Sequence, residues 1–232
     1  MAIPEWQWDE KIQRGTDYAS VERVREYDER MAAMRDVAAE SERILNQIGI
    51  SAGDDLLEIG TGTGALARAA ARRCRRVVAL DVSPIMLEYA AQRAREEGIT
   101  TIEFCEAGFL TYEHDGEPFA AVVSQLALHH LPDAWKLIAL GRLAGFLRPG
   151  GRFYLTDVVF FDEAQSDWPG HCAALVDAMP PSSRVEMARH IRQEFSTFDW
   201  VMRALLERAG FAIESVERER GFLSHYLCRR HA

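Results

Sequence analysis

The stretch LLEIGTGTGALA, residues 56–67, changes character twice along its length. It begins as an apolar run, then places glycine at positions 60, 62 and 64, and continues with residues that favour a helix. Glycine lacks a Cβ atom, so it suits places where the backbone turns with a positive φ or passes very close to another molecule. A turn that leads into a helix also points backbone N–H groups at a ligand. The stretch therefore predicts a strand, a ligand-binding turn and a helix.

Strand and helix patterns alternate through the middle of the chain. Short apolar runs predict five strands, at residues 54–60, 76–82, 101–107, 119–126 and 152–160. Helical patterns lie between them, at residues 64–74, 83–98 and 132–151. In the second of these helices, Ser83 is the expected N-cap and Pro84 the first residue. Strands that alternate with helices of this length form a parallel sheet with helices on both faces.

The C-terminal part departs from this rhythm. Residues 161–198 contain turn signals and two helical pieces, which indicates an insertion over the sheet or a structural connection. A helix at 199–210 and two closely spaced strands, 211–220 and 222–230, predict an antiparallel hairpin. The predicted fold class is α/β: a doubly wound, Rossmann-like, mostly parallel seven-stranded sheet with a C-terminal antiparallel hairpin.

Four segments follow from this pattern. They are an N-terminal arm and helical cap (1–49), a Rossmann-like core (50–160), the insertion (161–198), and a helix with a strand hairpin that completes the core (199–232). In the first segment, apolar residues recur at helical spacing from about Tyr18 to Ile48, and Gly49 is the expected stop. Trp6 and Trp8 are expected to anchor the arm to the core.

The composition is that of an ordinary soluble globular protein, with 48% apolar and 27% charged residues. No run approaches the roughly 18 apolar residues that a membrane span needs, and residues 1–15 contain no apolar signal-peptide core. The four cysteines form no CxxC pair, which favours reduced thiols in a cytoplasmic protein. The net charge of −9 opposes binding to a phosphate polymer, so neither a membrane nor a nucleic acid is an expected partner.

The glycine turn by itself leaves the ligand open. A Walker A loop is excluded because no Lys-Ser or Lys-Thr follows the last glycine. The sequence GTGTGA still satisfies the dinucleotide pattern G-x-G-x-x-A. Asp81 ends the second strand about twenty residues further on, where it suits a ribose diol. That position fits a dinucleotide and a smaller nucleoside cofactor equally well.

Four further features separate these two possibilities. Glu58 gives the pattern E-x-G-x-G-x-G, VVSQLALHHLPD (122–133) follows the fourth strand, LRPGGRFYL (147–155) leads into the fifth, and a hairpin closes the chain. Taken in this order, the motifs resemble the class I S-adenosylmethionine-dependent methyltransferases. The likeness is greatest to the small-molecule branch that includes the ubiquinone and menaquinone C-methyltransferases. It covers residues 50–160 and, more loosely, the C-terminus.

The resemblance implies S-adenosylmethionine as the cofactor, bound by the 50–160 core, and S-adenosylhomocysteine as the product. Asp81 would accept hydrogen bonds from both ribose hydroxyls, while Val82 and Met86 would pack on the adenine. Ser124 and Gln125 would offer backbone carbonyls to the α-ammonium. The methionine half would be lined by the turn and the acid before it, namely Glu58, Gly60, Thr61, Gly62 and Gly64.

One position departs from the family pattern. After the third strand the family usually has Gly-Asp-Ala, in which the acid bonds the adenine amino group. Here the stretch is EAGFL (106–110), and Gly108 replaces the acid. The adenine is then expected to be held by backbone groups at Gly108 and Phe109 and by the Phe109 ring.

Methyl transfer from a sulfonium is an in-line displacement. The protein chiefly aligns the acceptor and excludes water, and a base assists where the acceptor carries a proton. The candidate catalytic residues are His130, His129 and Tyr27. The sequence HHLP also suits a plain helix-entry element, and Tyr27 suits packing as well as contact with a ligand.

The insertion at 161–198 occupies the place where relatives build their acceptor pocket. His190 and Glu194 lie one helical turn apart, so they can face the same direction. Such a pair can bind a metal or move a proton, but it is more often a surface or helix-capping pair. His171 and Cys172 have no third ligand at zinc spacing, and no metal site is predicted.

The function expected from the sequence is methyl transfer to a small organic acceptor by a cytoplasmic enzyme that acts as a monomer or homodimer. Two alternatives stay open: methylation of tRNA or protein, and a cofactor-binding module without catalysis. The acidic net charge weighs against the first alternative. The intact glycine turn, Asp81 and the histidine pair weigh against the second.

Overall fold

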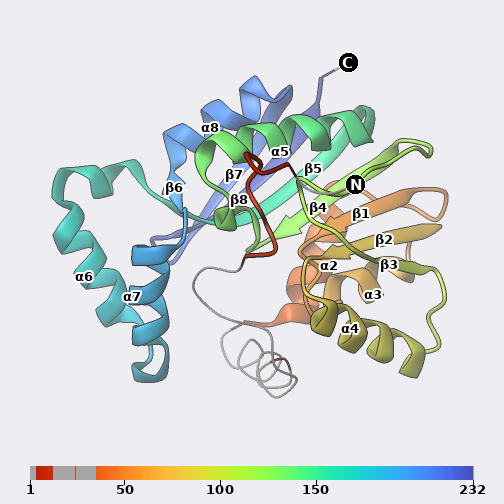
Figure 1. Cartoon of the computed structure of the whole chain (residues 1–232), viewed down its shortest axis with the longest axis horizontal. Coiled ribbons are helices and arrows are strands. Elements are labelled where there is room, and N and C mark those ends of the chain that lie inside the picture. Colours follow the sequence, from red (N-terminus) through yellow and green to blue (C-terminus); the bar gives the residue numbers. More distant parts are fainter. Residues whose placement is uncertain (1–3, 13–23, 25–34, 232) are drawn as a thin grey trace.

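The structure is a computed structural model that describes residues 4–12, 24 and 35–231, and it confirms the α/β fold (Figure 1). Seven strands follow one another across the sheet in the order β3-β2-β1-β4-β5-β8-β7. Strands β1 to β5 pair in parallel, whereas β8 is antiparallel to both β5 and β7. Their bounds are β1 Asp55–Ile59, β2 Arg76–Asp81, β3 Ile102–Glu106, β4 Phe119–Gln125, β5 Leu147–Phe160, β7 Phe211–Glu219 and β8 Leu223–Arg230.

Helices cover both faces of the sheet (Figure 1). One face carries α2 (Val37–Ile48), α3 (Ala65–Ala71) and α4 (Pro84–Glu96), and the other carries α5 (Asp133–Phe146) and α8 (Asp199–Arg208). Successive side chains of β1 pack against opposite helical layers: Leu56 packs with α2 and α3, and Leu57 packs with α5 and α8. Every residue of β1 is buried, which explains its uninterrupted apolar run.

The helix ends follow the predicted capping chemistry. The Ser83 side chain accepts a hydrogen bond from Met86 N at 3.3 Å, and Pro84 is the first residue of α4. Helix α2 ends at Gly49, whose φ of +65° is the left-handed conformation that glycine adopts most readily. Both predicted boundaries are confirmed.

The single helix expected from about Tyr18 to Ile48 is wrong near its middle. Helix α2 begins only at Val37, because Asp36 has non-helical backbone angles and its side chain accepts a hydrogen bond from Ala39 N at 3.0 Å. Residues 13–23 and 25–34 lie outside the described part of the chain.

Two strand features differ from the sequence prediction. Strand β5 begins at Leu147 rather than at 152, so it includes the Pro-Gly-Gly sequence, and its pairing with β4 shifts register between Phe119 and Ala121. Strand β6 (Thr197–Phe198) was not predicted. It pairs in parallel with residues 159–160 of β5, and so ties the end of the insertion to the sheet.

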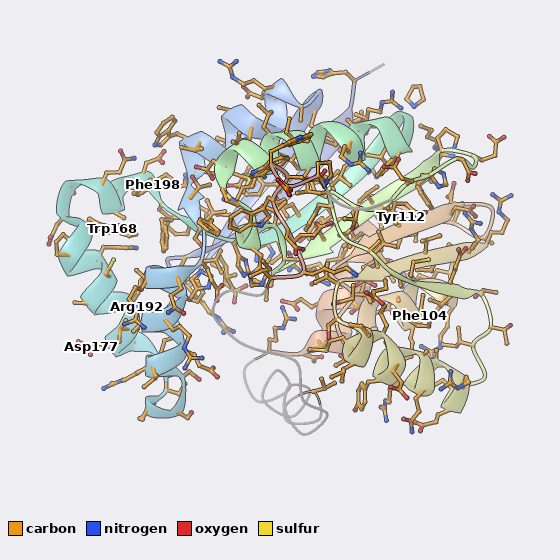
Figure 2. All side chains as sticks on the ribbon, viewed as in Figure 1. Phe104, Tyr112, Trp168, Asp177, Arg192 and Phe198 are labelled. Atoms are coloured by element: carbon orange, nitrogen blue, oxygen red, sulfur yellow. The ribbon has the colours of Figure 1, made fainter. Side chains whose placement is uncertain are left out.

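The insertion forms a helical pair at one end of the molecule, apart from the helices that cover the sheet (Figure 1). Helices α6 (Trp168–Ala178) and α7 (Arg184–Gln193) follow short 3-10 turns, η2 (Asp162–Asp167) and η3 (Pro181–Ser183). Figure 2 labels Trp168 and Phe198, whose rings lie 5.5 Å apart at the base of this pair. The pair thus has a small apolar core of its own against the end of β5. Within the described ranges, no helix combines the length and apolarity needed to cross a membrane.

Candidate functional site

A cavity of about 340 Å³ lies at the carboxyl ends of β1, β2 and β4. This volume falls within the range of roughly 300–1,000 Å³ that is usual for small-molecule sites. The strand order reverses between β1 and β4, so the cavity lies at the switch point where open α/β sheets bind their ligands. The glycine turn, the loops after β2 and β4, the N-terminal arm and the insertion all contribute to its wall.

The glycine turn forms one wall of this cavity. Gly60 and Gly62 both have positive φ, at +76° and +53°. A Cβ atom at Gly60 would lie 2.5 Å from the Cβ of Ala127, so close packing requires glycine there. A Cβ atom at Gly62 would meet no protein atom within 4 Å. Gly60 therefore serves the fold, and Gly62 leaves space for a ligand.

Alanine substitution at Gly60 should mainly reduce stability, whereas alanine substitution at Gly62 should mainly weaken ligand binding. We expect Gly60→Ala to lower the free energy of unfolding by about 2–4 kcal/mol, because it combines a left-handed alanine with overpacking. Gly62→Ala should cost only about 1–2 kcal/mol for its backbone conformation, yet weaken binding of adenosyl compounds at least tenfold. Denaturant unfolding and calorimetric titration measure the two effects. Equal loss of binding in both variants at unchanged stability would contradict this division of roles.

Asp81 faces the glycine turn from the end of β2. One of its carboxylate oxygens accepts a hydrogen bond from Gly62 N at 2.8 Å, and the other accepts one from Ser83 N at 2.9 Å. Burial raises the pKa of Asp81, and these amide donors oppose the shift. Each carboxylate oxygen can accept a further hydrogen bond. Asp81 can therefore hold the turn in shape and still bind a pair of hydroxyl groups.

Four of the residues implied for the cofactor lie behind the cavity wall and do not line it: Glu58, Thr61, Gly64 and Ser124. Glu58 is buried, accepts a hydrogen bond from Thr61 Oγ1 at 2.7 Å, and has its pKa raised to about 8 by burial. Gly64 packs so closely against α4 that a Cβ atom there would lie 2.9 Å from a methyl carbon of that helix. Ser124 Oγ donates to Ile59 O at 3.0 Å. The contacts of these four residues support the turn from behind the cavity wall.

The end of the cavity near β2 and β3 is mainly apolar. Val82, Met86 and Phe109 line it beside Asp81, and they offer the flat apolar surfaces that a purine ring needs. Gly108 also lines this end, where it meets the carboxylate of Glu10 from the N-terminal arm. Glu10 was not predicted as a site residue, because it is one of several acidic residues in the arm and belongs to no motif.

The loop after β4 forms the opposite end. Gln125 lines the cavity, and Leu126 adopts a φ of +53°, which is rare for a residue other than glycine. Leu126 N donates to Thr156 O at 2.8 Å, and this bond holds the turn. The 3-10 turn η1 (Leu128–His130) then presents His129 and His130 to the cavity. Strain of this kind is concentrated at functional sites.

His129 is the centre of a buried polar network. Its Nδ1 lies 2.5 Å from Asp157 Oδ1, and its Nε2 lies 3.1 Å from Glu194 Oε2. The same Glu194 oxygen lies 2.5 Å from His190 Nδ1. The pair His190 and Glu194, which is more often found on protein surfaces, thus faces the cavity, and the Glu194 side chain is only 6% exposed.

The charges of this network follow from its contacts. Burial alone lowers the pKa of His129, but Asp157 and Glu194 outweigh burial and raise it to about 9. Burial also opposes ionisation of Glu194, yet hydrogen bonds from His129 and His190 hold the pKa of Glu194 well below its usual range. Burial and the nearby charge of His129 lower the pKa of His130 to about 4. At neutral pH the network therefore contains a charged His129 and a neutral His130.

His130 has an unused ring nitrogen. Its Nδ1 is buried and makes no hydrogen bond with the described residues. His129, His130 and Glu194 each bring one ligand-capable atom within 4.8 Å of the others. Such spacing also suits a divalent cation, but both ring nitrogens of His129 already have carboxylate partners. Two buried atoms of the network, His130 Nδ1 and Asp157 Oδ2, have no hydrogen-bond partner among the described residues.

An apolar wall closes the cavity beside this network. It comes from β5, the insertion and the C-terminal hairpin, and consists of Val158, Met179, Met187, Phe222 and Leu223. Two hydrogen bonds tie the end of the insertion to the core. Phe195 N donates to His129 O at 2.8 Å, and the buried Lys136 Nζ donates to Phe195 O.

Other candidates from the sequence lie elsewhere. Tyr27, proposed as a catalytic residue, and Tyr18 fall outside the described residues. His171 stacks on Trp168 with ring centroids 6.0 Å apart, in the small core of the insertion. Trp200, at the start of α8, is 55% exposed and does not line the cavity.

The cavity wall offers three features that suit an adenosyl compound. Gly62 has open space beside it, Asp81 offers a carboxylate, and Met86 and Phe109 offer apolar surfaces. Residues 56–151 match the family described as a methyltransferase domain. An uncharacterized methyltransferase of Geobacillus kaustophilus is 30% identical over 206 residues, which are 89% of this chain and 86% of the relative. The chain belongs to the S-adenosylmethionine-dependent methyltransferases.

Solved structures share the fold of this methyltransferase. A putative methyltransferase from Bacillus halodurans superposes with a TM-score of 0.66 at 16% identity, covering 84% of this chain and 100% of the other. The N-methyltransferase NodS from Bradyrhizobium japonicum was solved with S-adenosyl-L-homocysteine. It superposes with a TM-score of 0.59 at 18% identity, and the match covers 83% of this chain and 86% of NodS. The methyltransferase uses S-adenosylmethionine as its cofactor, as predicted.

Proposed function

We propose that this methyltransferase methylates a small organic acceptor held between His130 and the apolar wall of the insertion. The observation that carries the proposal is one cavity that continues from Asp81, through the glycine turn, to the His129–Glu194 network. A cofactor whose sugar lies at Asp81 would place its sulfur end toward that network. The apolar wall then favours an acceptor with an apolar body, as in the ubiquinone and menaquinone C-methyltransferase branch.

The residues on the cofactor side take the following roles in this proposal. Asp81 binds the ribose hydroxyls, and Val82, Met86 and Phe109 pack against the adenine. Gln125 offers its backbone carbonyl to the α-ammonium. The residues behind the wall, Glu58, Thr61, Gly64 and Ser124, keep the turn in its binding shape.

The chemistry needs alignment and one proton acceptor. The cofactor supplies a methyl group made electrophilic by the sulfonium to which it is bound. The neutral ring of His130 accepts a hydrogen bond from the acceptor and takes the proton that the acceptor loses. The carboxylates of Glu194 and Asp157 then stabilise the imidazolium that forms. Residues 161–198 act as the substrate cap, because their side chains complete the wall and exclude water.

Two other functions fit less well. A net charge of −9 opposes binding to tRNA. A module without catalysis would not need an unused histidine nitrogen beside two buried carboxylates. In this proposal the part of the cavity lined by His130 and Met187 holds the acceptor next to the cofactor.

The proposal is tested on helix α7, which offers a matched pair of residues. Met187 lines the cavity, whereas Val185 is 68% exposed on the same helix. Pools of small metabolites are first screened for release of S-adenosylhomocysteine. We expect Met187→Glu to raise the KM for the active acceptor at least tenfold, because it places a charge in the apolar wall. Binding of S-adenosylhomocysteine should change less than threefold, and Val185→Glu should change neither quantity.

Two results would contradict the proposal. Turnover on tRNA or a protein, with none on any small molecule, would exclude a small acceptor. Full activity of Met187→Glu would remove the insertion from the acceptor site.

A further inference from the structure

The N-terminal arm is fixed to the core at several points before it reaches the cavity. Trp6 stacks on Trp135 with ring centroids 6.4 Å apart, and Trp8 meets the edge of Phe195 at 5.3 Å. The Lys11 ammonium lies 2.5 Å from a carboxylate oxygen of Glu106. Contacts on both sides therefore hold the residue between them, Glu10.

The Glu10 carboxylate lies inside the protein, and the residue is only 8% exposed. Its Oε1 accepts hydrogen bonds from Leu110 N at 3.0 Å and from Thr111 Oγ1 at 2.6 Å. Its Oε2 shares the Leu110 N–H at 3.1 Å and has no other hydrogen bond among the described residues. Burial raises the pKa of Glu10, and hydrogen bonds from the Thr111 side chain and from backbone groups of residues 109–111 oppose that shift.

The loop after β3 leaves room for this carboxylate. A Cβ atom at Gly108 would overlap the Glu10 side chain, and the nearest of its atoms is Oε2. Any other residue at 108 would push the arm away. Glycine at position 108 is therefore required for the Glu10 carboxylate to lie where it does.

Glu10 and Gly108 line the same end of the cavity as Asp81, Met86 and Phe109. With the ribose at Asp81 and the purine against the apolar side chains, the edge of the purine faces this end. Adenine presents an amino group at its edge, and an amino group donates two hydrogen bonds. We propose that Glu10 Oε2 accepts a hydrogen bond from the adenine amino group, so that the N-terminal arm completes the cofactor site and selects adenosyl over 6-oxopurine ligands.

Calorimetric titration with two ligands tests this role. S-adenosylhomocysteine carries the 6-amino group, and S-inosylhomocysteine carries an oxygen in its place. We expect the wild type to bind the inosyl compound at least tenfold more weakly, because two oxygens would face each other. In Glu10→Gln the side-chain amide can donate to that oxygen, so the ratio of the two dissociation constants should fall to within about threefold of one.

Two matched controls separate recognition from anchoring. Thr111→Val removes a hydrogen bond that holds Glu10, and Glu106→Gln weakens the tie to Lys11. Both variants should weaken the two ligands by similar factors and keep the wild-type ratio. A wild type that binds the two ligands equally, or a Glu10→Gln variant that keeps the full preference, would overturn the proposal. The proposal rests on the cofactor placement of the proposed function, but no methyl acceptor enters the experiment, so its failure is distinguishable from failure of the proposed acceptor site.

Discussion

Replacement of Asp81 by asparagine should weaken binding of S-adenosylhomocysteine on the order of a hundredfold. The carboxylate accepts hydrogen bonds from the backbone of Gly62 and Ser83 and still has lone pairs that face the cavity. An asparagine amide would turn one acceptor into a donor, so either a backbone N–H or a ribose hydroxyl would lose its partner. A hydrogen bond to a charged group contributes about 1.5–3 kcal/mol, so the loss of one such bond weakens binding up to the order of a hundredfold. Isothermal titration measures the loss.

A matched control for this variant is Asp115→Asn. Asp115 lies on an exposed loop, so its replacement makes the same change of charge away from the cavity. Binding by the control should equal that of the wild type. Wild-type affinity in Asp81→Asn would refute the assignment of the ribose to the end of β2.

Replacement of His130 by glutamine should lower kcat on the order of a hundredfold or more, which is the usual contribution of a general base. The unused Nδ1 of His130 would be lost, while the size and polarity of the side chain are largely kept. Binding of S-adenosylhomocysteine should change by less than about threefold, since the residue acts on the acceptor. Single-turnover kinetics on the acceptor found by the screen measure the effect. An unchanged kcat would remove the proton-accepting role.

The pH profile of the wild type provides a second readout of the same network. The value of kcat/KM should fall as the pH drops through about 4, where His130 becomes protonated, and should change a second time as the pH rises through about 9, where His129 loses the charge that lowers the pKa of His130. Glu194→Gln removes a carboxylate that raises the pKa of His129, so the alkaline limb should move to lower pH. Glu207→Gln, on the exposed side of α8, should leave both limbs in place. Loss of activity in a chelator, restored by a divalent cation, would instead indicate a metal at the cluster.

The fold was predictable from the sequence because its signals are local. The glycine turn, the apolar runs and the capping residues Ser83 and Gly49 each act within a few positions, and all appear where expected. Asp36 was missed as a helix start because the apolar spacing continues across it. Strand β6 was missed because its two residues become a strand only through pairing with β5.

The candidate site was predictable only in part, since distant segments build it. His129 and His130 could be proposed from their place after β4, but their state depends on Asp157 and Glu194, which come from β5 and the insertion. Asp157 did leave a signal, because an acid within the apolar run LTDVVF must be buried and requires a partner. Glu10 left a weaker one: the missing acid at Gly108 indicated that another group fills that space.

A crystal structure of the protein with S-adenosylhomocysteine tests where the cofactor binds. We expect the compound to fill the cavity at the carboxyl ends of β1, β2 and β4. Both ribose hydroxyls should lie within hydrogen-bond distance of Asp81, and the sulfur should face His130. A sugar bound away from Asp81, or a sulfur turned away from the His129–Glu194 network, would refute the proposed placement of cofactor and acceptor.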